Sequence, residues 1–203
     1  MIRDLTAQFA SAWLSTSGIE IAAAALAVAY LLLAIGQRIE CWAAAFASSC
    51  LYVWVLFGAR LYMESALNAF YAAMALYGFW QWRRGRRGGS LAVSRWPPAR
   101  HLAAFGAIMA LSLLSWFFLR RFTQAAWPLV DSMVTWSSVY ATFLVARKVY
   151  ENWHWWLVID SVSFYLYITR HLYLTMLLFG LYLGLIVIGM RQWRRALPAH
   201  APR

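Results

Sequence analysis

The chain has 203 residues, of which 64% are hydrophobic, 18% are aromatic and only 12% are charged, and its formal net charge at pH 7 is +11. This composition lies far outside the range of a soluble domain of this length and indicates a membrane protein. The basic residues lie at the ends of apolar segments and in short loops. Membrane orientation therefore explains the positive charge, and nucleic acid is not expected as a partner.

Seven apolar windows follow one another, each close to the roughly 20 residues that a helix needs to cross a bilayer core of about 30 Å. We expect transmembrane helices over Gly18–Gly36, Cys41–Gly58, Tyr62–Trp82, His101–Leu119, Trp127–Ala146, Trp153–Thr169 and Leu172–Met190. No cleavable signal peptide is expected, because the first window is long enough to span and another follows directly. The sequence therefore predicts an all-α integral membrane protein with seven transmembrane helices.

Residues 1–17 form a separate, weaker feature ahead of the first window. Ile2, Leu5, Phe9 and Trp13 recur there at helical spacing. This pattern is typical of an amphipathic helix that lies flat at the membrane interface. A disordered tail is an equally open alternative for this segment.

The basic residues are unevenly divided between the two sides of the predicted bundle. Thirteen of the eighteen fall on one side: Arg38, Arg83, Arg84, Arg86, Arg87, Arg95, Arg100, Arg147, Lys148, Arg191, Arg194, Arg195 and Arg203. Loops rich in arginine and lysine normally face the cytoplasm. We therefore expect the N-terminus outside and the C-terminus in the cytoplasm.

Part of the sequence recurs after a shift of 111 positions, without a gap. Eleven of forty-five positions are then identical, from Glu40 against Glu151 to the run Gln-Trp-Arg-Arg at 81–84 against 192–195. Apolar sequence matches itself easily, but chance rarely aligns a polar run as well. The shift relates the first three predicted helices to the last three and leaves the fourth as a connector.

The repeat predicts a 3+1+3 arrangement. Its parts are a first three-helix repeat at 18–82, a basic cytoplasmic loop at 83–100, a connecting helix at 101–119, a second repeat at 127–190 and a cytoplasmic tail at 191–203. Three helices invert the chain direction and a fourth restores it, so both repeats are expected to enter the membrane the same way round. Parallel repeats of this kind occur in transporters, with the substrate site near the midplane between them.

The stretch ENWHWWLVIDSVSFYLY, residues 151–167, carries an acid inside an apolar and aromatic helix. An ionisable group in hydrocarbon costs about 2.5 to 3.5 kcal/mol on insertion scales, so it normally faces protein or a wet cavity. Steps of three or four residues place four side chains on one helix face: Trp153, Trp156, Asp160 and Ser163. Two indoles and a carboxylate suit a flat, positively charged organic ligand. A structural hydrogen bond from Asp160 to a neighbouring helix is the alternative.

Four further residues are candidates for substrate contact. Asn68 and Tyr71 on the third predicted helix are suited to hydrogen bonding, with an interhelical amide bond and plain packing as their respective alternatives. Asp131 and Thr135 lie on the fifth predicted helix. Asp131 follows Pro128 by one turn, so helix capping competes with a site role. The Thr135 hydroxyl also suits close helix packing.

Three stretches resemble the PnuC family of vitamin transporters, and the likeness covers nearly the whole chain: LNAFYAAMALYGFWQW, WPLVDSMVTWSSVYATFLVARKVYENW and the segment at 151–167. The family pattern in the last of these is similar to W-x-x-W-x-x-x-N-x-x-Y, carried here by Trp153, Trp156 and position 160. The chain departs from it in having Asp160 for the asparagine and Ser163 for the tyrosine. An acid in place of an amide changes what the pocket prefers.

The resemblance implies a uniporter of the bacterial inner membrane that works by facilitated diffusion and forms a homotrimer. A cytoplasmic kinase then phosphorylates the product so that it cannot leave. Founding members of the family carry nicotinamide riboside, and relatives carry thiamine, riboflavin or deoxynucleosides. Nicotinamide riboside and thiamine are both aromatic cations, so an aromatic, acidic cavity suits either. The same cavity argues against an anionic substrate such as the phosphorylated mononucleotide.

The same residues bear on other classes of function. A proton-coupled transporter of a small organic cation would exchange protons at Asp131, Asp160 or Glu20. A retinal protein is excluded, because the only lysine, Lys148, lies in a predicted loop. An enzyme or metal site is not indicated, since the four histidines lie near helix ends or in the tail without metal-binding spacing. No cofactor is expected, and GRRGG lacks the Lys-Ser/Thr ending of an ATP-binding loop.

Overall fold

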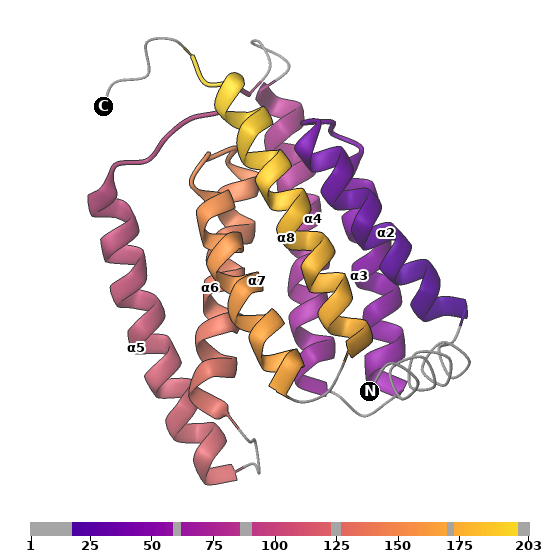
Figure 1. The fold of residues 1–203 in the computed structure, drawn as a ribbon, viewed down its shortest axis with the longest axis vertical. Helices are drawn as coiled ribbons and strands as arrows, with labels where there is room; N and C mark the ends of the chain where they lie inside the picture. The colour runs from indigo at the N-terminus through magenta and orange to yellow at the C-terminus, as the bar shows by residue number, and fades with distance from the viewer. Residues whose placement is uncertain (1–17, 59–61, 86–90, 123–126, 170–172, 199–203) are drawn as a thin grey trace.

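The structure is a computed structural model that describes residues 18–58, 62–85, 91–122, 127–169 and 173–198. These residues form seven long α-helices (Figure 1): α2 (Gly18–Ile35), α3 (Cys41–Gly58), α4 (Tyr62–Gly85), α5 (Pro98–Phe122), α6 (Pro128–Ala146), α7 (Asn152–Thr169) and α8 (Tyr173–Arg195). The prediction of an all-α protein with seven helices is confirmed. The interfacial helix that the sequence predicts for residues 1–17 lies outside the described residues.

Three helices continue past their predicted ends, into segments that the sequence assigns to the basic loop and the tail. α4 runs to Gly85, α5 extends from Pro98 to Phe122, and α8 runs to Arg195. A hydropathy window stops at the first charged residues, but the backbone hydrogen bonds of a helix do not depend on side-chain charge. Arginine is also a good helix former, and its long stem carries the charged head toward polar surroundings.

The surface of the described part of the chain is suited to lipid. By length and composition, α2, α3, α5, α6 and residues Met176–Arg195 of α8 are apolar enough to cross a membrane. Large side chains are highly exposed on them, with Trp54 at 74% and Leu102 at 72%. Exposed apolar area of this extent requires a covering other than water. α4 and α7 fall outside this apolar group, because they carry polar residues such as Asn68 and Asp160.

Among the described helices, α5 lies at one side of the other six (Figure 1). We refer to α2–α4 as the first half and to α6–α8 as the second half. In the first half, α3 packs against both α2 and α4, and in the second half α7 packs against both α6 and α8. The halves meet through α4 against α6 and α2 against α8, while α5 packs against α6 alone among the described helices. This arrangement leaves the inner faces of α2, α4, α6, α7 and α8 to surround a common space.

Pairs of equivalent contacts occur at the 111-residue spacing found in the sequence. Trp42 lies against Gly78 in the first half, and Trp153 lies against Gly189 in the second. A Cβ atom at either glycine would lie 2.4 Å from the indole ring. Only glycine allows this approach between helix and ring. The two contacts are therefore equivalent at the spacing of the predicted repeat.

Four tryptophans meet between the halves, near the N-terminal ends of α3 and α7 and the C-terminal ends of α4 and α8. We call Trp42, Trp82, Trp153 and Trp193 the tryptophan cluster. Ring centroids are 5.5 Å apart in both Trp42–Trp82 and Trp153–Trp193, with interplanar angles of 87° and 85°. This edge-to-face geometry is favoured by aromatic quadrupoles. The cluster fills the space between the halves at this end.

The tryptophan cluster also joins the halves by reciprocal hydrogen bonds. Trp82 Nε1 donates to the carbonyls of Val145 at 3.3 Å and Ala146 at 3.1 Å, and Trp193 Nε1 donates to the carbonyl of Ala34 at 3.0 Å. Ala34 and Val145 are themselves 111 positions apart. Each half therefore donates an equivalent bond to the other.

A second link between the halves lies beside the tryptophan cluster. Gln37 and Lys148, also 111 positions apart, occupy the turns after α2 and α6 with positive φ angles of 55° and 51°. Lys148 Nζ donates to Gln37 Oε1 at 3.3 Å and lies 4.4 Å from the centroid of the Trp82 ring. Lys148 is buried, and this burial lowers the pKa of its ammonium group.

Trp82→Phe and Trp193→Phe are each expected to lower the free energy of unfolding by about 2 kcal/mol, because each removes a buried indole N–H together with the hydrogen bond that it donates across the halves, and leaves a smaller ring in the cluster. Thermal unfolding of the purified protein in detergent, followed by circular dichroism, measures the change. Trp54→Phe on the exposed face of α3 is the control and is expected to leave the midpoint unchanged. A loss confined to one of the two cluster variants would contradict their equivalence.

The segment 91–97, within the predicted basic loop, packs against the turn between α6 and α7. The Ser94 amide donates to the Lys148 carbonyl at 3.0 Å, and the Tyr150 amide donates to the Ser94 carbonyl at 2.8 Å. Val93 is 2% exposed. This part of the loop is thus structured, and it ties the start of α5 to the second half.

Candidate functional site

A cavity of about 320 Å³ lies between the halves, lined by α2, α4, α6, α7 and α8; we call it the larger cavity. Most of its wall is apolar or aromatic: Ala27, Tyr30, Leu31, Ala34, Tyr71, Val134, Val145, Trp153, Trp156, Ile159, Phe179, Tyr182 and Ile186. Its remaining residues are polar: Ser138, Asn152, Asp160 and Ser163. An apolar cavity of this size with a few polar groups is typical of a small-molecule site.

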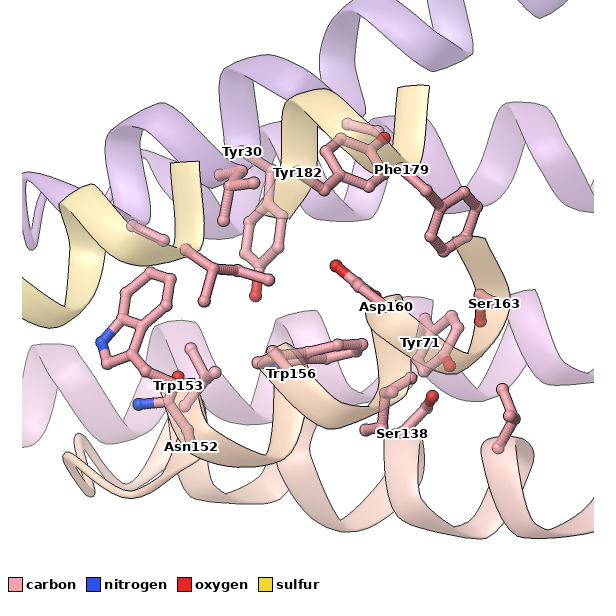
Figure 2. Close-up of a pocket in the computed structure, with 17 residues that line it drawn as sticks. Tyr30, Tyr71, Ser138, Asn152, Trp153, Trp156, Asp160, Ser163, Phe179 and Tyr182 are labelled. Atoms are coloured by element: carbon pink, nitrogen blue, oxygen red, sulfur yellow. The ribbon is translucent and has the colours of Figure 1, made fainter. Parts of the chain in front are cut away.

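One face of α7 forms a large part of this wall (Figure 2). The face includes the four residues that the sequence places together, Trp153, Trp156, Asp160 and Ser163, and also Asn152 and Ile159. Trp155 lies on another face, where its ring centroid is 5.1 Å from that of Tyr140. The helical step of about 100° per residue accounts for both observations.

Asp160 is the acid of the larger cavity. It is 6% exposed, and its carboxyl group extends from α7 into the cavity (Figure 2). Within the described part of the chain, no hydrogen bond or ion pair reaches this carboxyl group, and no lysine, arginine or histidine lines the cavity. A structural hydrogen bond from Asp160 to a neighbouring helix, the alternative that the sequence allowed, is therefore not found among the described residues. A buried carboxylate without a partner is costly, so a cationic ligand or a proton would stabilise it.

A smaller cavity of about 180 Å³ adjoins the larger one and is lined mainly by the first half. Its wall consists of Ala27, Tyr30, Trp42, Ala45, Ser48, Ser49, Tyr52, Asn68, Tyr71, Thr142 and Trp156. Four of these residues line both cavities: Ala27, Tyr30, Tyr71 and Trp156. The two spaces are therefore neighbours across a shared wall of three aromatic side chains and an alanine.

The two candidates on α4, Asn68 and Tyr71, differ in which cavities they line. Tyr71 lines both, whereas Asn68 lines only the smaller one. Asn68 Nδ2 donates to the Glu64 carbonyl of its own helix at 2.9 Å. No bond from Asn68 to another helix occurs among the described residues, so its carbonyl oxygen is not used in helix packing.

Asp131 and Thr135 do not line either cavity. Asp131 lies in the first turn of α6, where the helix dipole favours an acid. Thr135 Oγ1 donates to the Asp131 carbonyl at 2.8 Å, which satisfies the hydroxyl within its own helix. The structure therefore keeps these two candidates apart from the six others.

Three aromatic residues of the larger cavity were not among the candidates. Phe179 and Tyr182 follow the candidates Asn68 and Tyr71 by 111 positions. The internal repeat could therefore have predicted that both residues line the cavity. Tyr30 is different, because a single tyrosine in the apolar α2 resembles any packing residue. No pattern in the sequence distinguishes it.

A protein-family model described as nicotinamide mononucleotide transporter matches residues 17–195. The riboflavin/roseoflavin transporter RibM of Streptomyces davaonensis is 28% identical to this chain over 148 residues, covering 68% of each sequence. The nicotinamide riboside transporter PnuC of Escherichia coli K12 is 26% identical over 165 residues, covering 68% of this chain and 69% of its own.

The fold also occurs among solved structures. The crystal structure of the vitamin B3 transporter PnuC superposes with a TM-score of 0.71 at 20% sequence identity, covering 88% of this chain and 81% of the other. At that identity the likeness concerns the fold alone. The two relatives are named for different vitamins, so their names do not decide between solutes.

Proposed function

This chain belongs to the nicotinamide mononucleotide transporter family, so it is a multi-pass membrane transporter and not an enzyme. We propose that it carries nicotinamide riboside by facilitated diffusion. Phosphorylation in the cytoplasm then keeps the solute from leaving. Thiamine, or another vitamin or nucleoside, is the alternative solute, since one relative is named for riboflavin. A membrane transporter is common to all of these possibilities.

The observation that carries the choice of solute is the buried carboxyl group of Asp160 in an aromatic wall, to which no described residue donates a hydrogen bond. Nicotinamide riboside has a flat pyridinium ring with one positive charge. Such a ring gains stacking energy on an indole such as Trp156, and a cation over an aromatic face gains about 0.5 to 2 kcal/mol. The carboxylate balances the charge, and the ring replaces the water that burial removes from Asp160.

We also propose how the protein is oriented in the membrane, which membrane it occupies and how many copies assemble. The N-terminus lies outside and the C-terminus lies in the cytoplasm of a bacterial inner membrane, and the protein forms a homotrimer. The distribution of the basic residues supports this orientation. The tryptophan cluster then lies at the cytoplasmic end, so release of the solute requires the bonds of Trp82 and Trp193 to break as the halves rock apart.

Proteoliposomes that contain the purified protein are expected to take up labelled nicotinamide riboside faster than empty vesicles. Unlabelled riboside and thiamine should compete. Nicotinamide mononucleotide should need about a 100-fold higher concentration, because no cationic side chain lines either cavity and Asp160 repels the phosphate. Collapse of a proton gradient should leave the uptake rate unchanged.

Each arm of this experiment has an outcome against the proposal. Equal uptake by loaded and empty vesicles would contradict transport of the riboside. Competition by thiamine with no uptake of riboside would favour the alternative solute. A rate that falls with the proton gradient would favour a proton-coupled mechanism, and equal competition by the mononucleotide would contradict a cation-selective cavity.

A further inference from the structure

We propose that anionic phospholipid headgroups bind along a row of aromatic rings that carries three exposed arginines, where α4 and α6 end and α5 begins. Four residues form this row, and we call them the aromatic row: Trp80 and Tyr77 on α4, Phe143 on α6, and Trp96 ahead of α5. None of the four lines either cavity. The inference is therefore independent of which solute the protein carries.

The aromatic row connects three parts of the fold. The Tyr77 ring centroid lies 6.4 Å from that of Trp80 and 6.2 Å from that of Phe143, with Tyr77 and Phe143 stacked at an interplanar angle of 13°. Phe143 in turn lies 6.1 Å from Trp96. The row thus runs from α4 in the first half, over α6 in the second half, to the segment that precedes α5.

Three rings of the aromatic row each carry an arginine four residues further along the chain. The guanidinium carbons lie over these rings as follows: Arg84 at 3.9 Å from the Trp80 centroid, Arg100 at 5.2 Å from Trp96 and Arg147 at 5.7 Å from Phe143. All three arginines are exposed. A guanidinium that stacks by its face keeps the N–H groups at its edge free to donate to phosphate oxygens.

No acid pairs with these three stacked arginines among the described residues. The described acids at this end of the molecule are Glu40 and Glu151. Glu40 lies 3.4 Å from Arg38, and Glu151 accepts from the Trp96 amide at 3.2 Å and lies 4.0 Å from Arg95. The aromatic row therefore carries three positive charges that repel one another, and an anion would stabilise them.

Helix dipoles account for two of the three positions but not for the third. Arg84 lies in the last turn of α4 and Arg147 directly follows α6, where the helix dipole favours a cation. Arg100 lies in the first turn of α5, where the dipole disfavours a cation. The positive end of α5 and the Arg100 side chain both favour an anion at this point.

The surface beside the aromatic row matches a lipid better than a soluble phosphate. Leu76, two turns before Arg84, is 58% exposed, and Phe105, more than one turn after Arg100, is 46% exposed. Because α4 ends and α5 begins at the row, both side chains lie on the membrane side of their arginine. α4 and α5 each pack against α6 but, among the described residues, not against each other. Acyl chains can therefore cover α4 and α5 while the phosphate reaches the arginines.

Native mass spectrometry of the purified full-length protein is expected to show at least tenfold tighter binding of phosphatidylglycerol than of phosphatidylcholine with the same acyl chains. Arg84→Gln, Arg100→Gln and Arg147→Gln are each expected to weaken phosphatidylglycerol binding about fivefold, and to leave phosphatidylcholine binding unchanged. The triple variant should bind the two lipids equally. An unchanged thermal unfolding midpoint in detergent shows that each variant is folded.

Arg120→Gln is the matched control on α5. Arg120 lies 5.5 Å from the Trp116 ring centroid at the opposite end of this helix, so its loss should leave the preference for phosphatidylglycerol unchanged. Equal binding of the two lipids by the wild type overturns the proposal. The same weakening by Arg120→Gln as by the three row variants also overturns it, because any exposed arginine would then serve.

Two further arms separate a lipid from other occupants. Glycerophosphoglycerol, the headgroup without acyl chains, is expected not to compete; competition at the concentration of the lipid would assign the arginines to a soluble phosphate and overturn the lipid site. Phe105→Gln is expected to weaken phosphatidylglycerol binding without changing the oligomeric state. A change of oligomeric state with lipid binding intact would assign this surface to a second copy of the chain instead.

Discussion

Asp160→Asn is expected to weaken binding of nicotinamide riboside about thirtyfold, or about 2 kcal/mol, because it removes the one acid of the larger cavity. The amide has nearly the shape of the carboxyl group, and among the described residues no hydrogen bond or ion pair is lost. We therefore expect the folded protein and its unfolding midpoint to be retained. Isothermal titration and a thermal unfolding curve measure the two effects separately.

A neutral analogue makes this test specific for charge. The dihydropyridine form of nicotinamide riboside has almost the same shape without the positive charge, so Asp160→Asn should bind it as well as the wild type does. Glu64→Gln, an exposed change at the start of α4 that lies outside both cavities, removes the same charge and should leave the riboside affinity unchanged. Loss of the folded Asp160→Asn protein would favour the structural role for this acid.

Gly189→Ala is expected to destabilise the protein by about 3 kcal/mol, the upper end of the usual cost of overpacking. The added Cβ would lie 2.4 Å from the Trp153 ring, and this ring is itself held edge-on against Trp193. The tryptophan cannot retreat without opening the cluster between the halves. A large fall in the thermal unfolding midpoint in detergent is the expected result.

The same helix provides the control for this change. A Cβ at Gly184 on α8 has no neighbouring atom within 4 Å, so Gly184→Ala should shift the midpoint little. Gly78→Ala, at the equivalent position against Trp42, should cost about as much as Gly189→Ala. Tolerance of alanine at both positions 78 and 189 would show that the contacts between tryptophan and glycine do not limit the packing.

The helices could be located from the sequence because apolar length is a strong signal in a membrane protein. Their ends were less accessible, since the arginine-rich turns at Gly85 and Arg195 remain helical after hydropathy has fallen. The packing of residues 91–97 against the α6–α7 turn could not be predicted from the sequence either. It depends on backbone hydrogen bonds of Ser94, which side-chain chemistry does not reveal.

The candidate site was predictable where helical spacing alone decides which side chains share a face. The face of α7 with Trp156 and Asp160 is of this kind. Asp131 shows the limit of this reasoning, because position along a helix does not tell which way a side chain faces. Tyr182 was recoverable from the repeat, whereas Tyr30 belongs to the wall only through the packing of α2 against the second half.

We expect a flat cation to occupy the space between the two halves beside Asp160. A structure of the protein determined with nicotinamide riboside bound tests this directly. We predict that the pyridinium ring stacks on Trp156 with its charge next to the Asp160 carboxylate. A riboside located elsewhere, or oriented with its ring away from Asp160, would contradict the account.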